Sequence, residues 1–353
     1  MRIIITVFAL ISGLFASNKV YGQVTVDAET GGLLTQHWAV PTLLDPAATG
    51  DIDFIRVRAG ARLDYLGSHD SPKNFFITGD SPFKVGGKRI GAGIIASSIT
   101  YDLFSNYSIG AQGSYKFNLK KNILSVGIQI GYFHTSFKGS ELTLTPGGNE
   151  NNTPEGGIND DLGEEEQLPE DNYDSRLDWP TQDVAGGALD LGVGIRFTHP
   201  KFHVGISGLH LTNAKIRLSK DGEENSGLRY IQSTLPTTMY FDAGGNIAIK
   251  NSLISLQPSL LIGTDFSDFT ALVEMRATYN GKVTFGIDYR YNRAFGALAG
   301  LNLKDFYIGY SWEYDYSRKP RGSTGNHELV IGYRFKLDLG DKNTFSHRSI
   351  RIM

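Results

Sequence analysis

Regular alternation between apolar and polar residues is the feature that most restricts the fold of this chain. From Ile55 to Tyr65 apolar side chains occupy every second position, and arginine, glycine or aspartate stands between them. Because successive side chains of a β-strand point to opposite faces, this pattern predicts a strand with one apolar and one charged face. Such a strand fits a soluble sandwich, whose charged face meets water. It also fits a membrane barrel, whose apolar face meets lipid.

The length of the alternating segments separates these two possibilities. We identify fourteen candidate strands, at 53–65, 73–81, 88–101, 105–117, 122–137, 185–198, 201–212, 238–250, 252–264, 268–279, 281–292, 294–302, 305–316 and 326–337. Strands of soluble sandwiches mostly have about five or six residues, whereas a tilted strand needs about nine to eleven residues to cross a membrane. The segments therefore predict an all-β fold, a transmembrane antiparallel up-and-down β-barrel of about 14 strands.

The connections between the segments give an independent indication. Those after even-numbered segments are short, whereas those after odd-numbered segments include the two longest, 138–184 and 213–237, and the basic stretch 317–325. An outer-membrane barrel has tight periplasmic turns and long external loops, and a soluble barrel has no reason to separate them in this way. The asymmetry predicts a location in the outer membrane of a Gram-negative bacterium, with residues 53–337 as the barrel.

Residues 1–22 have the composition of a signal peptide. Arg2 supplies the positive end, Ile3 to Phe15 the apolar core, and small residues precede Gln23. The apolar core is too short to span a bilayer, so we expect it to be removed. The chain contains no cysteine, which excludes disulfides, thiolate metal sites and a lipoprotein anchor.

The connection 138–184 differs in composition from the rest of the chain. It contains thirteen acidic residues against Lys138 and Arg176, a charge of −11, so the remainder of this chain of net charge −3 carries +8. Polar and glycine-rich, it has too little apolar surface to form a core, and we expect an acidic, solvated external loop. A calcium site at Asp160, Asp161 and Glu164 is an alternative, although their spacing matches no known calcium loop.

Charged residues on the polar faces of the strands would face the lumen of such a barrel. They are Arg56, Arg58, Arg62, Glu274, Arg276, Asp288, Arg290, Glu313 and Arg334. These side chains could form a network of ion pairs or line a conductive pore. A lumen of about fourteen strands is too wide for wall side chains alone to fill. Residues 23–52 form the spare segment that is long enough to enter it, and we expect them to lie on the periplasmic side or in the lumen as a plug.

No arrangement of residues indicates an enzyme. His327 and Glu328 begin like a zinc-protease motif, but Ile331 stands where the second histidine is required, and the stretch is a predicted strand. The sequence contains neither a Gly-x-Ser-x-Gly elbow nor a phosphate-binding loop. We therefore predict no catalytic residues, no cofactor, no metal and no nucleic-acid partner.

The stretch 36–50 carries the most specific motif of the chain. Pro41 and Pro46 exclude a regular helix and predict an extended, turning path, which an ordinary buried N-terminal segment would also have. The run from Leu44 through Asp45, Pro46 and Ala47 to Gly50 also resembles the opening motif of the PorP/SprF family, outer-membrane proteins of the type IX secretion system. Val40 and Asp45 stand where that family usually has asparagine.

The resemblance extends along most of the mature chain. Residues 188–195 and 202–211 resemble the central hairpin of the family, and 306–315 resembles its penultimate strand. Gly325, Asn326, His327, Glu328 and Leu329 resemble its closing strand, with Asn326 in place of serine. The family-motif residues are thus Pro41, Asp45, Pro46, Gly50, His327 and Glu328. The enlarged acidic loop departs from the family pattern.

The resemblance implies a non-enzymatic component of the type IX secretion and gliding machinery that supports the export of surface proteins. Its partners would be the outer-membrane translocon, the periplasmic ring, secreted adhesin cargo and outer-membrane lipid. The alternative is a fourteen-stranded transporter of hydrophobic small molecules of the fatty-acid-channel type, with the N-terminal segment as its hatch. A porin-like channel is a third possibility. A transporter would have an apolar pocket in its lumen, whereas an export component would have protein contacts and no transport.

Residues 338–353 would form a periplasmic C-terminal tail beyond the last strand. Its end mixes bulky apolar and basic side chains, and we interpret Phe345, Arg348, Ile350 and Arg351 as a partner-binding site. A frayed terminus is the alternative interpretation.

We predict that deletion of Phe345–Met353 lowers secretion of type IX cargo while the barrel still inserts and keeps its heat-modifiable gel mobility. The reason is that Ile350, Ile352 and Met353 gain nothing in water, whereas Arg348 and Arg351 suit an acidic periplasmic partner. Normal secretion from a normal barrel would leave the tail without a role. Loss of insertion would instead make it part of the assembly signal.

Overall fold

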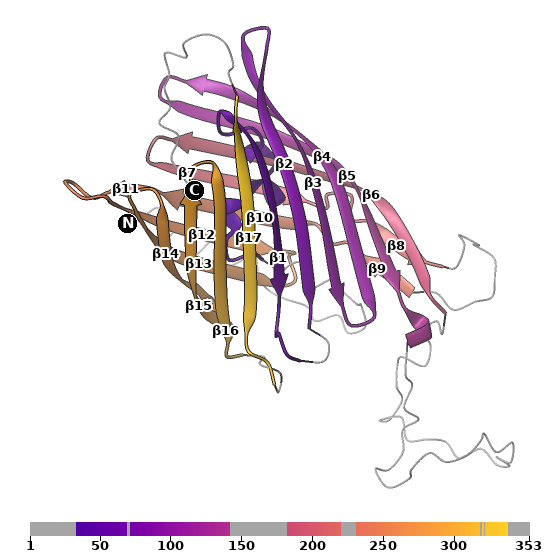
Figure 1. Ribbon diagram of the computed structural model, residues 1–353. Coiled ribbons are helices and arrows are strands. Elements are labelled where there is room, and N and C mark those ends of the chain that lie inside the picture. Colours follow the sequence, from indigo (N-terminus) through magenta and orange to yellow (C-terminus); the bar gives the residue numbers. More distant parts are fainter. Residues whose placement is uncertain are drawn as a thin grey trace, which may run out of the picture.

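The computed structural model describes residues 33–68, 71–141, 182–219, 231–317, 320 and 322–337, and these form a closed antiparallel barrel (Figure 1). Its fourteen strands are β1 (Phe54–Leu63), β2 (Lys73–Val85), β3 (Lys88–Tyr101), β4 (Phe104–Leu119), β5 (Asn122–Phe137), β6 (Val184–His199), β7 (Phe202–Leu209), β10 (Thr238–Gly245), β12 (Ile254–Thr264), β13 (Phe269–Tyr279), β14 (Val283–Arg290), β15 (Ala294–Leu303), β16 (Phe306–Asp315) and β17 (Asn326–Lys336). The short β11 (Ile247–Ala248) continues the edge of β10 along β12. The predicted number of strands and their up-and-down order are confirmed.

Pairing of the first and last strands contributes to closure of the sheet. β1 pairs with β17 from Phe54↔Lys336 to Leu63↔His327, and β10 pairs with β12 on the other side. A closed sheet has no free edge, so its strands satisfy their backbone hydrogen bonds with one another, as a segment in lipid must. In the described part of the chain, no helix has the length and hydropathy of a membrane-spanning helix.

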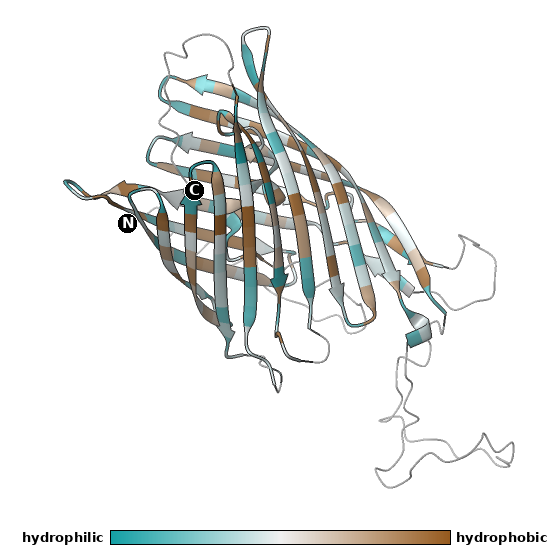
Figure 2. Cartoon of the chain, in the orientation of Figure 1, coloured by the Kyte–Doolittle hydropathy of each residue, from teal (hydrophilic) through white to brown (hydrophobic). Residues whose placement is uncertain are grey.

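Alternate residues divide between the outside and the lumen. On β5 the side chains of Val126, Ile128 and Ile130 are exposed, whereas Ser125 and Gln129 on the opposite face are buried. Figure 2 shows the resulting mixture of apolar and polar positions along the strands. A polar side chain is thus removed from the surface while an aliphatic one is presented to it, which is the reverse of a soluble domain and the arrangement of a barrel in lipid.

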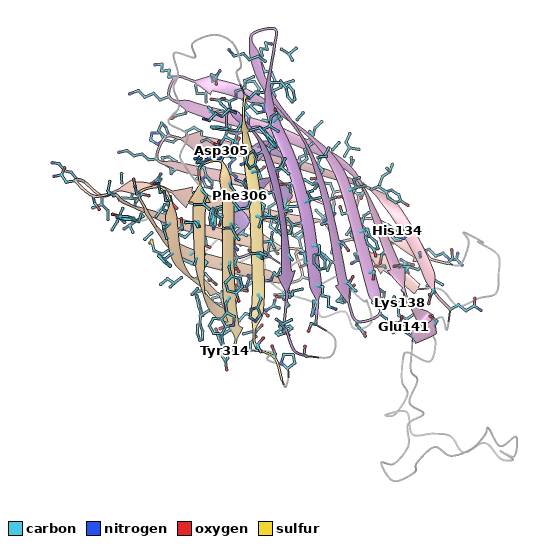
Figure 3. All side chains as sticks on the ribbon, viewed as in Figure 1. His134, Lys138, Glu141, Asp305, Phe306 and Tyr314 are labelled. Atoms are coloured by element: carbon cyan, nitrogen blue, oxygen red, sulfur yellow. The ribbon has the colours of Figure 1, made fainter. Side chains whose placement is uncertain are left out.

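The longest connections all lie at one end of the barrel, together with the short links from β3 to β4, β12 to β13 and β14 to β15. At the other end all connections are short, and they join β2 to β3, β4 to β5, β6 to β7, β10 to β12, β13 to β14, and β15 to β16. We call this the short-turn end; Figure 3 labels Asp305 and Phe306 there, and Tyr314, Lys138 and Glu141 at the opposite, long-connection end. Which end faces the cell exterior stays a prediction.

Two local features differ from the sequence-based expectation. β2 continues to Val85 through Pro82, where we expected a turn. β1 pairs with β2 only as far as Asp80, so Pro82 lies where β2 has a free edge on that side, and a proline is tolerated there. The connection between β7 and β10 holds a hairpin, β8 (Lys215–Leu218) with β9 (Ile231–Thr234).

The hairpin β8–β9 adds a small core at the long-connection end. Ile216 and Leu218 of β8, with Leu235 directly after β9, pack on apolar side chains of β4, β5 and β6: Phe104, Phe133, Phe137 and Val184. β8 has only four residues, and alternation over so short a run gives too weak a pattern to predict a strand.

We predict that Ile128→Lys on the lipid-facing side of β5 lowers the free energy of unfolding by about 2–4 kcal/mol, because a lysine near the middle of the bilayer loses its hydration. Leu119→Lys is the matched control: Leu119 is also exposed but lies at the end of β4, beside Lys120. Near an interface the same charge costs about 0–1 kcal/mol. The free energies of unfolding of the two variants are compared by urea titration in lipid vesicles, with heat-modifiable gel mobility as the measure of the folded fraction. Equal losses would contradict the placement of the membrane.

Candidate functional site

The lumen of the barrel holds the chain that precedes β1. From Leu33 to Gly50 this luminal segment is almost entirely buried and packs against the inward faces of the strands. It contains three 3₁₀ turns, η1 (His37–Ala39), η2 (Pro41–Leu43) and η3 (Pro46–Ala48). The expected extended path is therefore wrong in detail. Pro41 and Pro46 each occupy the first position of a turn, where a φ near −65° is suitable and no N–H is needed.

A buried carboxylate on the last strand holds the beginning of the segment. Glu328 on β17 accepts hydrogen bonds from the backbone N–H groups of Thr35 and Gln36, both at 2.8 Å. Arg62 on β1 lies beside it, 3.4 Å from the Glu328 carboxylate, and donates to Thr35 Oγ1 at 3.1 Å. First strand, last strand and luminal segment thus meet at one point.

The contact between Arg62 and Glu328 belongs to a network of ion pairs across the lumen. Arg62 also pairs with Glu313 on β16 and, at 2.9 Å, with Asp64. Glu313 in turn accepts from Arg290 on β14 at 2.9 Å, and Arg290 donates to the carbonyl oxygen of Leu33 at 2.8 Å. Buried charges are tolerated only when they are paired and hydrogen-bonded, so the four strands and the segment stabilise one another.

Apolar packing fixes the middle of the luminal segment. Trp38 lies edge-on to Tyr307 with ring centroids 5.7 Å apart, and the guanidinium of Arg276 lies 3.9 Å from the centre of the indole ring. Tyr307 donates to Gln36 Oε1 at 2.8 Å. The surrounding apolar cluster is Leu34, Trp38, Ala39, Val40, Phe76, Leu298, Tyr307 and Val330.

The end of the segment is attached near the short-turn end. Asp45 caps η3 by accepting from Ala47 N at 2.8 Å, and it pairs with Arg196 on β6 at 3.1 Å. Gly50 N donates to Asp80 Oδ2 at 2.8 Å, and the same carboxylate receives two hydrogen bonds from Arg56 at 2.8 and 3.0 Å.

Glycines in the wall allow η3 to approach the strands. A Cβ on Gly127 of β5 would lie 2.3 Å from Ala47 N, which is closer than atoms can pack. Gly50 itself has a φ of +64° and a Cβ there would lie 2.7 Å from Gly91, so a side chain is excluded by both strain and space.

Eight of the nine charged residues that the sequence assigned to the lumen are buried. They are Arg56, Arg58, Arg62, Glu274, Arg276, Asp288, Arg290 and Glu313. Arg62, Arg290 and Glu313 meet in the network above, and Arg276 pairs with Glu274. Arg334 is half-buried near the short-turn end; it donates to the Lys304 carbonyl oxygen at 3.1 Å and lies over the ring of Phe54.

Sequence reasoning missed a second cluster, around Asp242 on β10. This carboxylate pairs with Arg196 at 2.9 Å and with His203 at 2.8 Å, and His37 Nε2 lies 3.8 Å away. Lys116 likewise pairs with Asp51 at 2.6 Å. Arg196 and Lys116 occupy inward positions of β6 and β4. The alternation of apolar and polar residues along these strands would have identified both as lumen-facing charges.

The cluster around Asp242 borders a small cavity close to the short-turn end. Its volume is about 100 Å³, and its lining includes His37, Asp45, Arg56, Arg196 and Asp242. A space of this size holds a few water molecules. No group of three or more histidine, aspartate or glutamate side chains in the described residues is arranged to hold a metal ion.

The family-motif residues fall at the attachment points of the segment. Asp45, Pro46 and Gly50 make the contacts described above, and Glu328 holds Thr35 and Gln36. His327 points away from the lumen, where its Nδ1 lies 2.7 Å from the Tyr310 hydroxyl. The proposed partner-binding residues Phe345, Arg348, Ile350 and Arg351, and the acidic loop between 142 and 181, lie outside the described residues.

We predict that Glu328→Ala lowers the free energy of unfolding by about 3–5 kcal/mol, because it leaves Arg62 with one partner fewer and two buried N–H groups unpaired. Glu141→Ala is the control. Glu141 forms an exposed ion pair with Lys138 at 2.8 Å, and its loss costs less than about 1 kcal/mol. Denaturant titration of both refolded variants measures the difference. Equal effects would show that the buried network does not stabilise the barrel.

Solved outer-membrane proteins resemble the fold at low sequence identity. A FadL homologue from Pseudomonas aeruginosa is 13% identical, with a TM-score of 0.47 over 92% of this chain and 100% of that chain. The Pseudomonas putida toluene transporter TodX is 9% identical, with a TM-score of 0.42 over 84% of this chain and 94% of the other. Omp33 from Acinetobacter baumannii is 7% identical, with a TM-score of 0.41 over 81% and 99%. No curated protein matches the sequence.

The family comparison covers nearly the whole chain. The model described as "Type IX secretion system membrane protein PorP/SprF" matches residues 28–333, which include the luminal segment and all of the barrel except the last residues of β17. Together with the barrel fold, this match confirms the predicted location in the outer membrane of a Gram-negative bacterium. The chain belongs to the PorP/SprF family of type IX secretion system membrane proteins.

Proposed function

We propose that this protein is a non-enzymatic component of the type IX secretion and gliding machinery that supports the export of surface proteins. The observation that carries the proposal is the family match over residues 28–333. Membership of this family implies interaction with other components of the secretion system. The outer-membrane translocon, the periplasmic ring and secreted adhesins are the partners that we propose.

The filled lumen supports a role as a partner rather than as a conduit. The luminal segment occupies the interior from the long-connection half, where Glu328 holds Thr35, to the short-turn end, where Asp80 holds Gly50. Exported polypeptide would have to displace this segment, which would break its hydrogen bonds to Glu328 and the ion pair between Asp45 and Arg196. We therefore propose that the segment acts as a plug and that cargo passes through another component.

The composition of the interior argues against a transporter of hydrophobic small molecules. Such a transporter needs an apolar pocket of ligand size. The cavity near the short-turn end is small and bordered by Arg56, Arg196 and Asp242, and the apolar cluster around Trp38 is filled by protein. These features favour the export role over the fatty-acid-channel alternative.

The positions of His327 and Glu328 support the absence of an enzymatic role. As neighbours on β17 their side chains project to opposite faces of the sheet: Glu328 is buried in the lumen, and His327 lies on the outside beside Tyr310. They cannot act on the same substrate atom or metal ion.

Removal of the protein tests the proposal directly. In a strain that lacks this chain, we expect surface proteins exported by the type IX system to remain in the periplasm and gliding to fail. Complementation with the intact chain should restore both, and the wild-type protein should retain secretion components in a pull-down from outer membranes in mild detergent. The amount of an unrelated outer-membrane barrel controls for general damage to the membrane.

A different outcome would support the alternative. Normal export and gliding combined with reduced uptake of a radiolabelled long-chain fatty acid would contradict the export role and indicate a transporter. Normal behaviour in all of these assays would contradict both functions.

A further inference from the structure

Lysines mark every turn at the short-turn end of the barrel. Each of the six connections there carries one or two exposed lysines, within the turn or at the first residue after it. We call these the lysine rim: Lys88, Lys120, Lys121, Lys201, Lys250, Lys282 and Lys304. From the β2–β3 turn to the β15–β16 turn, successive short turns are separated by two strands, roughly 10 Å along the sheet. Between the β15–β16 and β2–β3 turns the spacing is four strands, because β17 and β1 close the barrel there.

The lysine rim has almost no acidic counterpart within the described residues. Asp53 pairs with Arg89 at 2.7 Å, Asp51 faces inward to Lys116, and Asp305 is the remaining acidic residue of the short turns. In the described part of the chain the rim lysines have no ion pair. At the long-connection end the described connections instead contain acidic residues as well as basic ones: Asp64, Asp102, Glu141, Asp183, Asp265 and Asp268.

The rim lies directly at the border of the lipid-facing surface. Exposed apolar residues adjoin the lysines in sequence: Leu119 precedes Lys120, Phe202 follows Lys201, Ile249 precedes Lys250, and Leu303 precedes Lys304. A lysine in this position extends its apolar stem along the hydrocarbon boundary and places its ammonium group at the level of the headgroups. Phe306, labelled with Asp305 in Figure 3, lies at the same level.

We propose that the lysine rim binds the anionic phospholipid headgroups of the membrane leaflet that the short turns reach. Lipid is favoured over an acidic protein because the lysines are spread over all six turns and lie next to the lipid-facing residues. A protein that docks on one side would need them gathered on one side. Basic residues next to a membrane are attracted to anionic lipid, and salt weakens this attraction. The proposal does not depend on the secretion role.

The test uses the full-length protein in nanodiscs of phosphatidylcholine, with or without phosphatidylglycerol. We expect phosphatidylglycerol to raise the temperature at which the wild-type barrel unfolds and to be retained in native mass spectrometry. In the rim variant Lys120→Gln, Lys201→Gln, Lys304→Gln we expect retention to fall roughly tenfold and the temperature shift to disappear, because three headgroup contacts are lost.

A matched variant controls for net charge. Lys73→Gln, Lys138→Gln, Lys215→Gln also removes three exposed lysines, but at the long-connection end, and should behave as wild type. Equal loss in both variants would overturn the proposal, as would a wild-type barrel whose stability and bound lipid do not respond to phosphatidylglycerol. If the rim variant keeps its lipid but loses a secretion component in the pull-down, the rim is a protein-docking surface and the proposal is wrong.

Discussion

Closure of the sheet in lipid is the constraint from which the rest of this structure follows. Every backbone N–H and C=O within the membrane needs a partner, so β1 must pair with β17 and β10 with β12. A closed ring of fourteen strands then encloses more space than its inward side chains fill. The luminal segment supplies the missing volume, and its own polar backbone needs hydrogen bonds there. Glu328, Asp80 and the wall residue Gln112, which donates to the Thr42 carbonyl oxygen at 2.7 Å, provide them.

Arg62 shows how this closure is coupled to the filling of the lumen. It belongs to β1, and its partners Glu313 and Glu328 belong to β16 and β17, the strands that close the sheet beside it. Two carboxylates this close repel each other unless cations lie between them, and Arg62 and Arg290 provide that charge. Because Thr35 and Gln36 donate to the same Glu328 carboxylate, the segment cannot leave without removing two of the hydrogen bonds that this buried charge receives. Occupation of the lumen and closure of the barrel are therefore one cooperative unit.

The sequence predicts the strands, which depend on local patterns, but it does not predict contacts between residues that are far apart in the chain. Alternation with a period of two locates all fourteen strands, and for β3 and β5 it gives the exact bounds. It does not reveal that Glu328 bonds to Gln36, 292 positions away, because no pattern within a strand specifies a partner across the lumen. The Asp45–Arg196 pair was missed for the same reason. The 3₁₀ turns were missed because a proline excludes a regular helix without choosing between an extended path and a tight turn.

The contacts of the luminal segment with the barrel wall explain what several family-motif residues do in the fold. Asp45 caps η3 and pairs with the wall, Gly50 fits where a Cβ would clash, and Glu328 holds the start of the segment. None of them is presented to a partner outside the barrel. Of the residues that carry the resemblance to the family, Asp45, Gly50 and Glu328 thus hold the segment in the lumen, whereas His327 lies on the outer face beside Tyr310. We propose that specificity for a partner lies on surfaces outside the cooperative unit of barrel and luminal segment, and that the acidic connection 138–184, which departs from the family pattern, is one of them.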